Sequence, residues 1–383
     1  MSRSLLALAL ALLVATTASA DWPMFRLDSA RSGLAADAAI TDLESVWTAE
    51  LGGSVDSSPA VAGGVVYVGT SLGTMHALRA EDGSPLWRFD TGGAVVSSPA
   101  VVGGLVVFGS VDGFLYAVRA ADGQLAWRYR TRGPVLSSPA VVDDTVLFGS
   151  MDGRLYAVDL RSGELRWRTD AGASIQGAPA VAEGVVLYGD DDARMRALAL
   201  DDGELRWEVR GSGKVVVAPV VGNGLAVFGL MGPTALRPPK LDFLVAVDLA
   251  TGQKRWALND AYSVLASPLV ANGLVYFVTV EGYVSKTVAR AVRLSDREVV
   301  WERQMGGVVD SSPALLGANL CLGCHDGRLY LLAADGGNVV DTEVLATKVY
   351  SSPAFSAGRV YVGANDGRLH CLQQSTTTAD GFR

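Results

Sequence analysis

The stretch Leu136 to Trp167, LSSPAVVDDTVLFGSMDGRLYAVDLRSGELRW, holds one complete copy of a pattern that returns along most of the chain. A small-residue segment leads into Pro139, and apolar runs follow that are separated by the turn-forming pairs Asp143-Asp144, Asp152-Gly153 and Ser162-Gly163. Each run has strand length and is rich in valine, leucine and tyrosine, which favour strands. The stretch therefore predicts a meander of four short antiparallel strands.

The proline of this unit sets the period of a repeat. Its equivalents are spaced 40, 40, 40, 40, 49, 45 and 40 residues apart and stand at Pro59, Pro99, Pro139, Pro179, Pro219, Pro268, Pro313 and Pro353. Four-stranded units that recur at about 40 to 50 residues are typical of a β-propeller, whose blades bury their faces against neighbouring blades. The sequence therefore predicts an all-β, eight-bladed propeller.

The two ends of the repeat complement each other. Six units end in a tryptophan and the seventh has Val340 there, but the eighth stops at Leu372 without an outer strand. The segment Glu44 to Leu51 has the outer-strand pattern and no inner strands before it. We therefore expect this segment to complete the last blade, which divides the chain into residues 1–20, an arm at 21–43, a propeller at 44–374 and a tail at 375–383.

The first 20 residues have the pattern of a cleaved secretory signal peptide. Arg3 is followed by an apolar run from Leu5 to Val14, and Ala18-Ser19-Ala20 precedes Asp21. The apolar run is shorter than the roughly 20 residues that cross a bilayer. We expect a periplasmic or secreted protein with no transmembrane segment and no lipid anchor, since no cysteine follows the cleavage site.

Charge and cysteine content exclude two further classes. The formal net charge is −8 and the chain has no basic run, which argues against nucleic acid as a partner. Three cysteines in an exported chain do not resemble a disulfide framework. We expect a monomer that is held together by packing.

Two positions of the repeat, compared across the eight units, indicate different roles: one is constant and structural, and the other varies and is a candidate for function. The position four before each proline is always β-branched, from Val55 to Val349, so these residues should pack between blades. The position three before the proline varies, and in the blades that closure makes neighbours it is polar. Asp310, Tyr350 and Asp56 occupy it in the seventh, eighth and first blades, and Lys348 lies two residues before Tyr350. This cluster is our candidate partner-binding site.

The second turn of the unit varies in length. In the fifth unit the segment Met231 to Phe243 replaces the tight turn and includes Arg237 and Lys240. Insertions in repeat proteins often gather on the binding face. We expect this loop to lie on the face of the polar cluster, with Tyr350 and Phe243 as aromatic anchors.

Two segments are similar to a known repeat. Ala157 to Trp167 (AVDLRSGELRW) and Ala246 to Trp256 (AVDLATGQKRW) resemble the tryptophan-docking motif of the quinoprotein, or PQQ-like, eight-bladed propellers. The resemblance implies that a tryptophan of each outer strand packs between adjacent blades. The tryptophans concerned are Trp47, Trp87, Trp127, Trp167, Trp207, Trp256 and Trp301.

The resemblance implies two kinds of function. PQQ-dependent dehydrogenases hold a quinone between a tryptophan and a vicinal cysteine pair, above a Ca²⁺ ion with acidic ligands, whereas BamB-like members are scaffolds of outer-membrane protein assembly. This chain has no vicinal cysteine pair. We therefore interpret it as a non-catalytic scaffold without a cofactor, whose partner is a protein, with the envelope-assembly machinery as a candidate; the alternative is a PQQ-binding oxidoreductase.

Two motifs suggest other chemistry. Cys321-Leu322-Gly323-Cys324-His325 spells the attachment sequence of c-type haem, which would make the protein an electron carrier. In the repeat, however, the motif falls on a strand of the seventh blade, so we favour chance substitutions within a blade. Asp190-Asp191-Asp192 could attract Ca²⁺, but we interpret it as an acidic turn in place of Asp-Gly.

Overall fold

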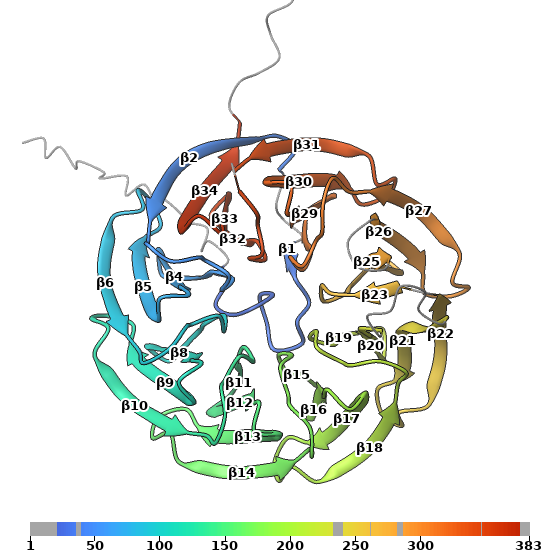
Figure 1. The fold of residues 1–383 in the computed structure, drawn as a ribbon, viewed down its shortest axis with the longest axis horizontal. Helices are drawn as coiled ribbons and strands as arrows, with labels where there is room; N and C mark the ends of the chain where they lie inside the picture. Colours follow the sequence, from blue (N-terminus) through green and yellow to red (C-terminus); the bar gives the residue numbers. More distant parts are fainter. Residues whose placement is uncertain are drawn as a thin grey trace, which may run out of the picture.

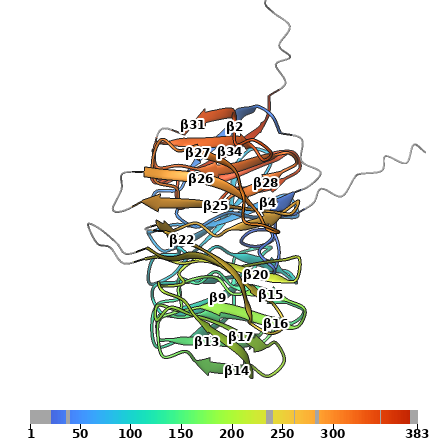
Figure 2. The same ribbon diagram turned by 90° about the vertical axis from the view of Figure 1, so that its right-hand side faces the viewer.

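The computed structural model describes residues 21–35, 40–232, 240–260, 262–281, 286–345 and 347–375, and it confirms the eight-bladed propeller. Eight antiparallel sheets are arranged around a central axis (Figure 1), and the described residues contain strands but no helix. Figure 2 shows the same ring edge-on. In seven blades the strands run outward in sequence order from an inner strand of three residues; in the eighth the outermost strand comes from the N-terminal part of the chain.

The first four blades follow the repeat closely. The first contains β3 (Ala60–Ala62), β4 (Val65–Gly69), β5 (Thr74–Arg79) and β6 (Pro85–Asp90), and the second β7 (Ala100–Val102), β8 (Leu105–Gly109), β9 (Phe114–Arg119) and β10 (Leu125–Arg130). The third contains β11 (Ala140–Val142), β12 (Thr145–Gly149), β13 (Arg154–Asp159) and β14 (Leu165–Asp170), and the fourth β15 (Ala180–Ala182), β16 (Val185–Gly189), β17 (Arg194–Ala199) and β18 (Leu205–Arg210).

The remaining blades carry the irregularities. The fifth contains β19 (Val220–Gly222), β20 (Leu225–Gly229), β21 (Leu241–Asp248) and β22 (Lys254–Asp260), and the sixth β23 (Tyr262–Val264), β24 (Leu269–Ala271), β25 (Leu274–Glu281), β26 (Lys286–Arg293) and β27 (Val299–Gln304). The seventh contains β28 (Ala314–Leu316), β29 (Asn319–Gly323), β30 (Arg328–Ala333) and β31 (Val339–Val344), joined by β1 (Leu34–Ala35), and the eighth β32 (Ala354–Ser356), β33 (Arg359–Gly363), β34 (Arg368–Gln374) and β2 (Leu43–Glu50).

The predicted closure is confirmed by the pairing of β2 with β34. The two strands are antiparallel, with Trp47 opposite Cys371, and a bulge lies between Ser45 and Trp47. The indole N–H of Trp47 donates to Ala80 O of the first blade at 3.1 Å. The N-terminal outer strand therefore completes the last blade and ties it to the first.

The β-branched column packs between blades, as the sequence predicts. All eight of its side chains are fully buried, and in seven of the eight interfaces the residue faces a glycine of the preceding blade. A Cβ on Gly109 would lie 2.5 Å from Val135 O, and one on Gly363 would lie 2.6 Å from Val55 O. In these seven interfaces the contact is too close for any residue but glycine on the second strand.

The arm enters the central hole and closes one end of it, as Figure 1 shows. Its backbone extends several inner strands: Trp22 exchanges two bonds of 2.8 Å with Val61, and Val181 N donates to Ser29 O at 2.7 Å. β1 pairs in parallel with β28 of the seventh blade. The arm therefore provides hydrogen-bond partners for some of the backbone groups along the free edges of the inner strands.

Two buried arginines anchor the arm. Arg31 donates to Pro179 O at 2.9 Å, to Ser138 O at 3.1 Å and to Phe25 O at 2.8 Å, while Arg26 donates to Pro268 O at 2.7 Å. Burial lowers the pKa of Arg26 to about 9 and that of Arg31 to about 10. The two side chains connect the arm to the third, fourth and sixth blades.

Two histidines lie within the sheets, at the position that Tyr116 and Tyr156 occupy in the second and third blades. His76 pairs with Arg88 across β5 and β6, and His370 pairs with Thr48 across β34 and β2. Burial is the main cause that lowers the pKa of each imidazole below the ordinary value of 6.5, and Arg88 adds to the effect at His76.

These histidines should make the fold sensitive to acid. In the unfolded chain these imidazoles take up protons near pH 6.5, whereas in the folded chain they do so only at lower pH. Their contribution to the free energy of unfolding is therefore fully present above pH 6.5 and is lost as the pH falls below it. Between about pH 7.5 and 5.5, the melting temperature of the double variant His76→Tyr and His370→Tyr should fall less than that of the natural chain. An equal loss in thermal unfolding would contradict this assignment.

Closure predicts cooperative unfolding of the whole ring. Removing Glu44 to Leu51 exposes β34 and detaches Trp47 from the first blade, so the melting temperature should fall by about 10 °C or more. Thermal unfolding followed by circular dichroism tests this, with removal of the single residue Ser375 as a control. A deletion variant that keeps the melting temperature of the full chain would show that closure is not needed.

Candidate functional site: the mouth of the central channel

The channel is a blind pocket. Its volume is about 190 Å³, and Phe25 of the arm lies at its closed end. Arg31 lies over the Phe25 ring, with 5.7 Å from Cζ to the ring centroid, which holds this floor in place. The other end opens on the face that carries the turns between the second and third strands, because Ser71 N in such a turn donates to Ser54 O at the entry of an inner strand. We call this the upper face.

Below the mouth, a belt of hydrogen bonds joins the blades around the wall. At six of the eight positions the N–H of the residue before the proline donates to a serine hydroxyl of the next blade, as from Ser58 to Ser98 at 3.0 Å and from Ser312 to Ser352 at 2.9 Å; Ala178 and Ala218 interrupt the belt. The bond from Ser352 N to Ser58 Oγ, at 2.9 Å, crosses the closure. In the repeat these serines stand out only as small residues, but their hydroxyls also join neighbouring blades.

The polar cluster includes a histidine that the sequence analysis placed elsewhere. His325 Nε2 lies 3.2 Å from Asp310 Oδ2, and the imidazole lies 4.3 Å from the Tyr350 ring, centroid to centroid. The other carboxylate oxygen of Asp310 is buried and accepts no hydrogen bond from the described residues. Asp310 and Tyr350 both line the channel. Histidine, carboxylate and phenol thus meet at the seam of the seventh and eighth blades.

The cluster continues across the closure into the first blade. Asp56 lines the same channel and accepts a hydrogen bond from the Ser54 hydroxyl. Asn365 Nδ2 of the eighth blade donates to that hydroxyl at 2.9 Å. Lys348 is exposed, and its carbonyl accepts from Asn365 N at 2.9 Å. The four residues singled out in the sequence therefore lie on three consecutive blades at one end of the channel.

The rest of the mouth is either neutralised or apolar. In the fourth blade Gln176 donates to both oxygens of Asp191 at 3.0 Å, and Lys214 lies 3.1 Å from the same carboxylate. Val96 and Leu136 line the channel in the second and third blades. Asp56 and Asp310 are consequently the charged residues among those that line the channel, and both are acidic.

The loop of the fifth blade contributes less than expected. Phe243 is 5% exposed and packs edge-on against Tyr262, at 5.5 Å between centroids, so its side chain belongs to the core and not to a contact surface. Lys240 is exposed and lies 3.3 Å from Asp260. Arg237 lies outside the described residues.

The C-x-x-C-H motif lies in the seventh blade, as the repeat predicts. Cys321 lies within β29, and Cys324 follows the end of the strand. Both side chains are fully buried, and all three cysteines of the chain are free. Burial raises the pKa of Cys324 to about 12, and that of Cys321 is raised further. Thioether bonds need accessible thiolates, which this arrangement does not supply.

The acidic triplet forms a turn held by its own chain. Asp190 is fully buried, accepts bonds from the N–H groups of Asp192 and Arg194, and lies 2.8 Å from the Arg196 guanidinium. Among the described residues, no group of three or more histidine, cysteine or acidic side chains could hold a metal ion.

Each outer-strand tryptophan contacts the following blade. Its indole N–H donates to a carbonyl there, as from Trp127 to Leu160 at 2.8 Å, and its ring covers a glycine with positive φ, such as Gly163. Trp256 is the exception: its buried N–H has no hydrogen-bond partner among the described residues, and Arg297, with a φ of 67°, lies where the next blade would have that glycine. These contacts define the PQQ-like class of eight-bladed propeller.

The particular family follows from sequence comparison. The family model described as outer membrane protein assembly factor BamB matches residues 35–168, 132–259 and 240–380. The chain therefore belongs to this family. A search of curated proteins found no match.

Solved structures share the fold at low sequence identity. BamB from Moraxella catarrhalis is 19% identical, with a TM-score of 0.72, over 88% of this chain and 99% of its own. Quinohemoprotein alcohol dehydrogenase from Comamonas testosteroni is 16% identical (TM-score 0.75, 95% and 82% covered), and a europium-containing methanol dehydrogenase is 14% identical (TM-score 0.73, 92% and 98% covered). At these identities the likeness establishes the fold alone.

Proposed function

We propose that this protein is an exported, non-catalytic scaffold that binds a protein partner at the channel mouth. The observation that carries the proposal is the polar cluster of Asp310, His325, Tyr350 and Asp56, which the closure of the ring brings together. The fold does not need these residues, because Val96 and Leu136 occupy the equivalent positions in other blades. Tyrosine and buried charged groups are frequent centres of binding energy at protein interfaces.

Membership of the outer membrane protein assembly factor family supports a partner in the cell envelope. The signal-peptide pattern of residues 1–20 supports export to the periplasm or beyond, with a mature chain that starts at Asp21, an arm, a propeller over 44–374 and a tail over 375–383. No helix among the described residues is long and apolar enough to span a membrane. We propose a monomer that works in the envelope.

The residues of the channel argue against the alternative, a quinone-dependent oxidoreductase. PQQ carries three carboxylate groups, and the described lining of the channel holds no basic side chain that could pair with them. The lining also contains neither tryptophan nor cysteine, the residue types that hold the quinone in the enzymes that this chain resembles.

The purified protein should therefore bind neither PQQ nor haem. We expect no change in tryptophan fluorescence when PQQ is titrated with Ca²⁺ present, because the described lining has no basic side chain to pair with the carboxylates of PQQ and neither tryptophan nor cysteine to hold the quinone. After expression with haem-maturation machinery, the denatured protein should show no Soret band, because Cys321 and Cys324 are buried. Saturable PQQ binding, or a Soret band that survives denaturation, would contradict the proposed function.

The partner-binding site is tested by substitution of its two central residues. Affinity capture from the periplasm identifies the partner, and Asp310→Ala with Tyr350→Ala should then weaken its binding about tenfold or more. The matched control is Val96→Ala with Leu136→Ala, at the same level of the second and third blades.

The control variant, Val96→Ala with Leu136→Ala, should bind the partner as the natural chain does. Weaker binding by both double variants would show that the partner covers the entire mouth. Unchanged binding by the Asp310 and Tyr350 variant, with thermal stability retained, would place the site elsewhere. A variant that lacks residues 233–239 reports separately on the loop of the fifth blade.

A further inference from the structure

The outer edge of the second blade departs from the repeat in its charges. At the upper ends of the last two strands, the third blade pairs Arg154 with Asp170 and the eighth pairs Arg368 with Glu50, at 3.3 and 3.1 Å. The second blade has Phe114 opposite Arg130 at the same register. An aromatic residue thus replaces the arginine, and an arginine replaces the acid. Because other blades fold with the opposite arrangement, the fold does not require Arg130.

Three arginines gather at this place. Arg128, Arg130 and Arg132 stand one, three and five residues after Trp127, a combination that no other blade contains. All three are exposed. The guanidinium carbon of Arg128 lies 4.8 Å from the centroid of the Phe114 ring and that of Arg130 lies 5.9 Å from it. We call these three arginines and Phe114 the arginine patch.

The arginine patch lacks counter-charges from the described residues. No ion pair joins any of its three arginines to a described carboxylate, whereas Arg210, Lys214 and Lys254 elsewhere on the ring each pair with an aspartate. The nearby carboxylates are held by other donors. Asp112 accepts from Gly92 N, Phe114 N and the Tyr116 hydroxyl. Three arginines therefore lie beside a single described carboxylate, and the patch is net positive in a chain of net charge −8.

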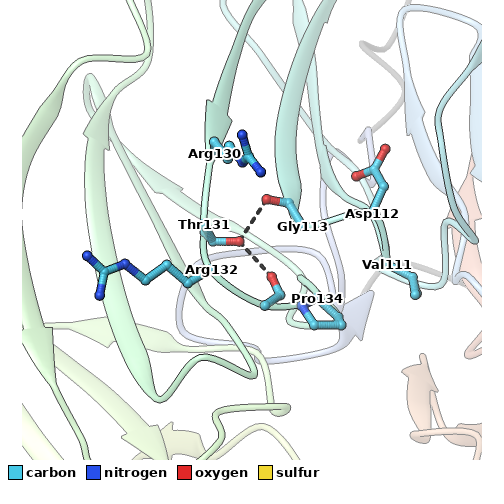
Figure 3. A pocket seen from close by; sticks show the side chains of 8 residues that line it. Val111, Asp112, Gly113, Arg130, Thr131, Arg132 and Pro134 are labelled. Carbon is cyan, nitrogen blue, oxygen red and sulfur yellow. Dashed lines mark hydrogen bonds between the residues drawn. The ribbon is translucent and has the colours of Figure 1, made fainter.

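Next to the patch is an open depression with a volume of about 550 Å³, lined by residues 130–134 and by the turn Val111 to Gly113, whose Asp112 is the one acidic residue in the described lining. Figure 3 shows the two arginines on either side of Thr131, with their guanidinium groups pointing in different directions. The Thr131 hydroxyl lies 2.8 Å from Gly113 O and 2.7 Å from Gly133 O, so its one proton is shared between two carbonyls, which holds the turn in place. The backbone that presents the arginines is therefore rigid, and each guanidinium can meet a different anionic group.

We propose that the arginine patch binds an acidic segment of a protein partner. An extended chain with successive carboxylates can contact the diverging guanidinium groups in turn, and an aromatic side chain can pack on Phe114 beside them. An anionic bilayer fits less well, because Asp56 and Asp310 at the channel mouth lie on the same face and would be repelled by it. The inference extends the proposed scaffold role but does not rest on the channel mouth.

Binding of a labelled hexaglutamate peptide to the mature chain tests this proposal. Fluorescence anisotropy at about 20 mM salt should show saturable binding that weakens as salt is raised, because screening reduces charge–charge attraction. Arg128→Gln, Arg130→Gln and Arg132→Gln together should weaken it about tenfold or more. The matched control is Arg79→Gln, Arg161→Gln and Arg206→Gln, which changes the net charge equally at exposed sites outside the patch.

A second variant separates loss of peptide binding from loss of folding. Phe114→Arg with Arg130→Asp installs the ion pair of the third blade, so it should fold normally and also lose peptide binding. The proposal is overturned if hexaglutamate does not bind, if the control triple variant loses binding as the patch variant does, or if phosphatidylglycerol vesicles bind through these arginines while the peptide does not. Peptide binding is measured without the natural partner, so its failure is distinct from failure at the channel mouth.

Discussion

The contact between a β-branched residue and a glycine of the preceding blade determines how closely the blades approach the axis. The residue carries a full side chain into the space that a Cβ on the glycine would occupy, and a Cβ on Gly363 would lie 2.8 Å from Val55 Cβ. This contact, repeated around the ring, positions the serine belt and the walls of the channel. The sixth blade has Val278 in place of the glycine, and its central hairpin extends from Leu274 to Arg293. The eighth and first blades meet through the same contact, so the closure resembles any other interface of the ring.

Much of this arrangement follows from the repeat. A period of about 40 residues predicts the blades, and the unmatched segment Glu44 to Leu51 predicts the strand that closes them. Because alternation along the inner strand places Asp56, Asp310 and Tyr350 toward the axis, their proximity could also be predicted. Proline, serine and glycine recur at equivalent positions of the blades, so the repeat can be recognised in a single sequence.

Other features depend on three-dimensional context that the pattern does not contain. His325 attracts attention as part of C-x-x-C-H, yet its neighbours Asp310 and Tyr350 come from distant parts of the sequence. The sequence places Phe243 in a loop, but β21 begins at Leu241, so Phe243 lies on a strand and its side chain is buried in the core. The arm carries no repeat, so nothing in the sequence predicts that Arg26 and Arg31 would reach the prolines of distant blades.

The structure gives the two faces of the ring different properties. On one face the arm fills the hole, and on the other the channel is open. Acidic residues lie at its mouth, at the seam of the seventh, eighth and first blades, while arginines that form no ion pair with a described residue lie at the outer edge of the second blade. A partner that covers the upper face would be oriented by both, since complementary charges determine register more than they add affinity. The acidic seam depends on the closure between Gly363 and Val55.

A double-mutant cycle across that contact tests the account most directly. Gly363→Ala should destabilise the protein by about 1 to 3 kcal/mol in denaturant unfolding because the new Cβ overpacks the interface, whereas Gly336→Ala, whose Cβ would meet only the flexible end of Asn338, should cost less. Val55→Ala removes part of the overlap, so the double variant should be less destabilised than the sum of the single changes. Strictly additive effects, or a Gly363→Ala protein as stable as the natural chain, would contradict closure of the ring at this interface.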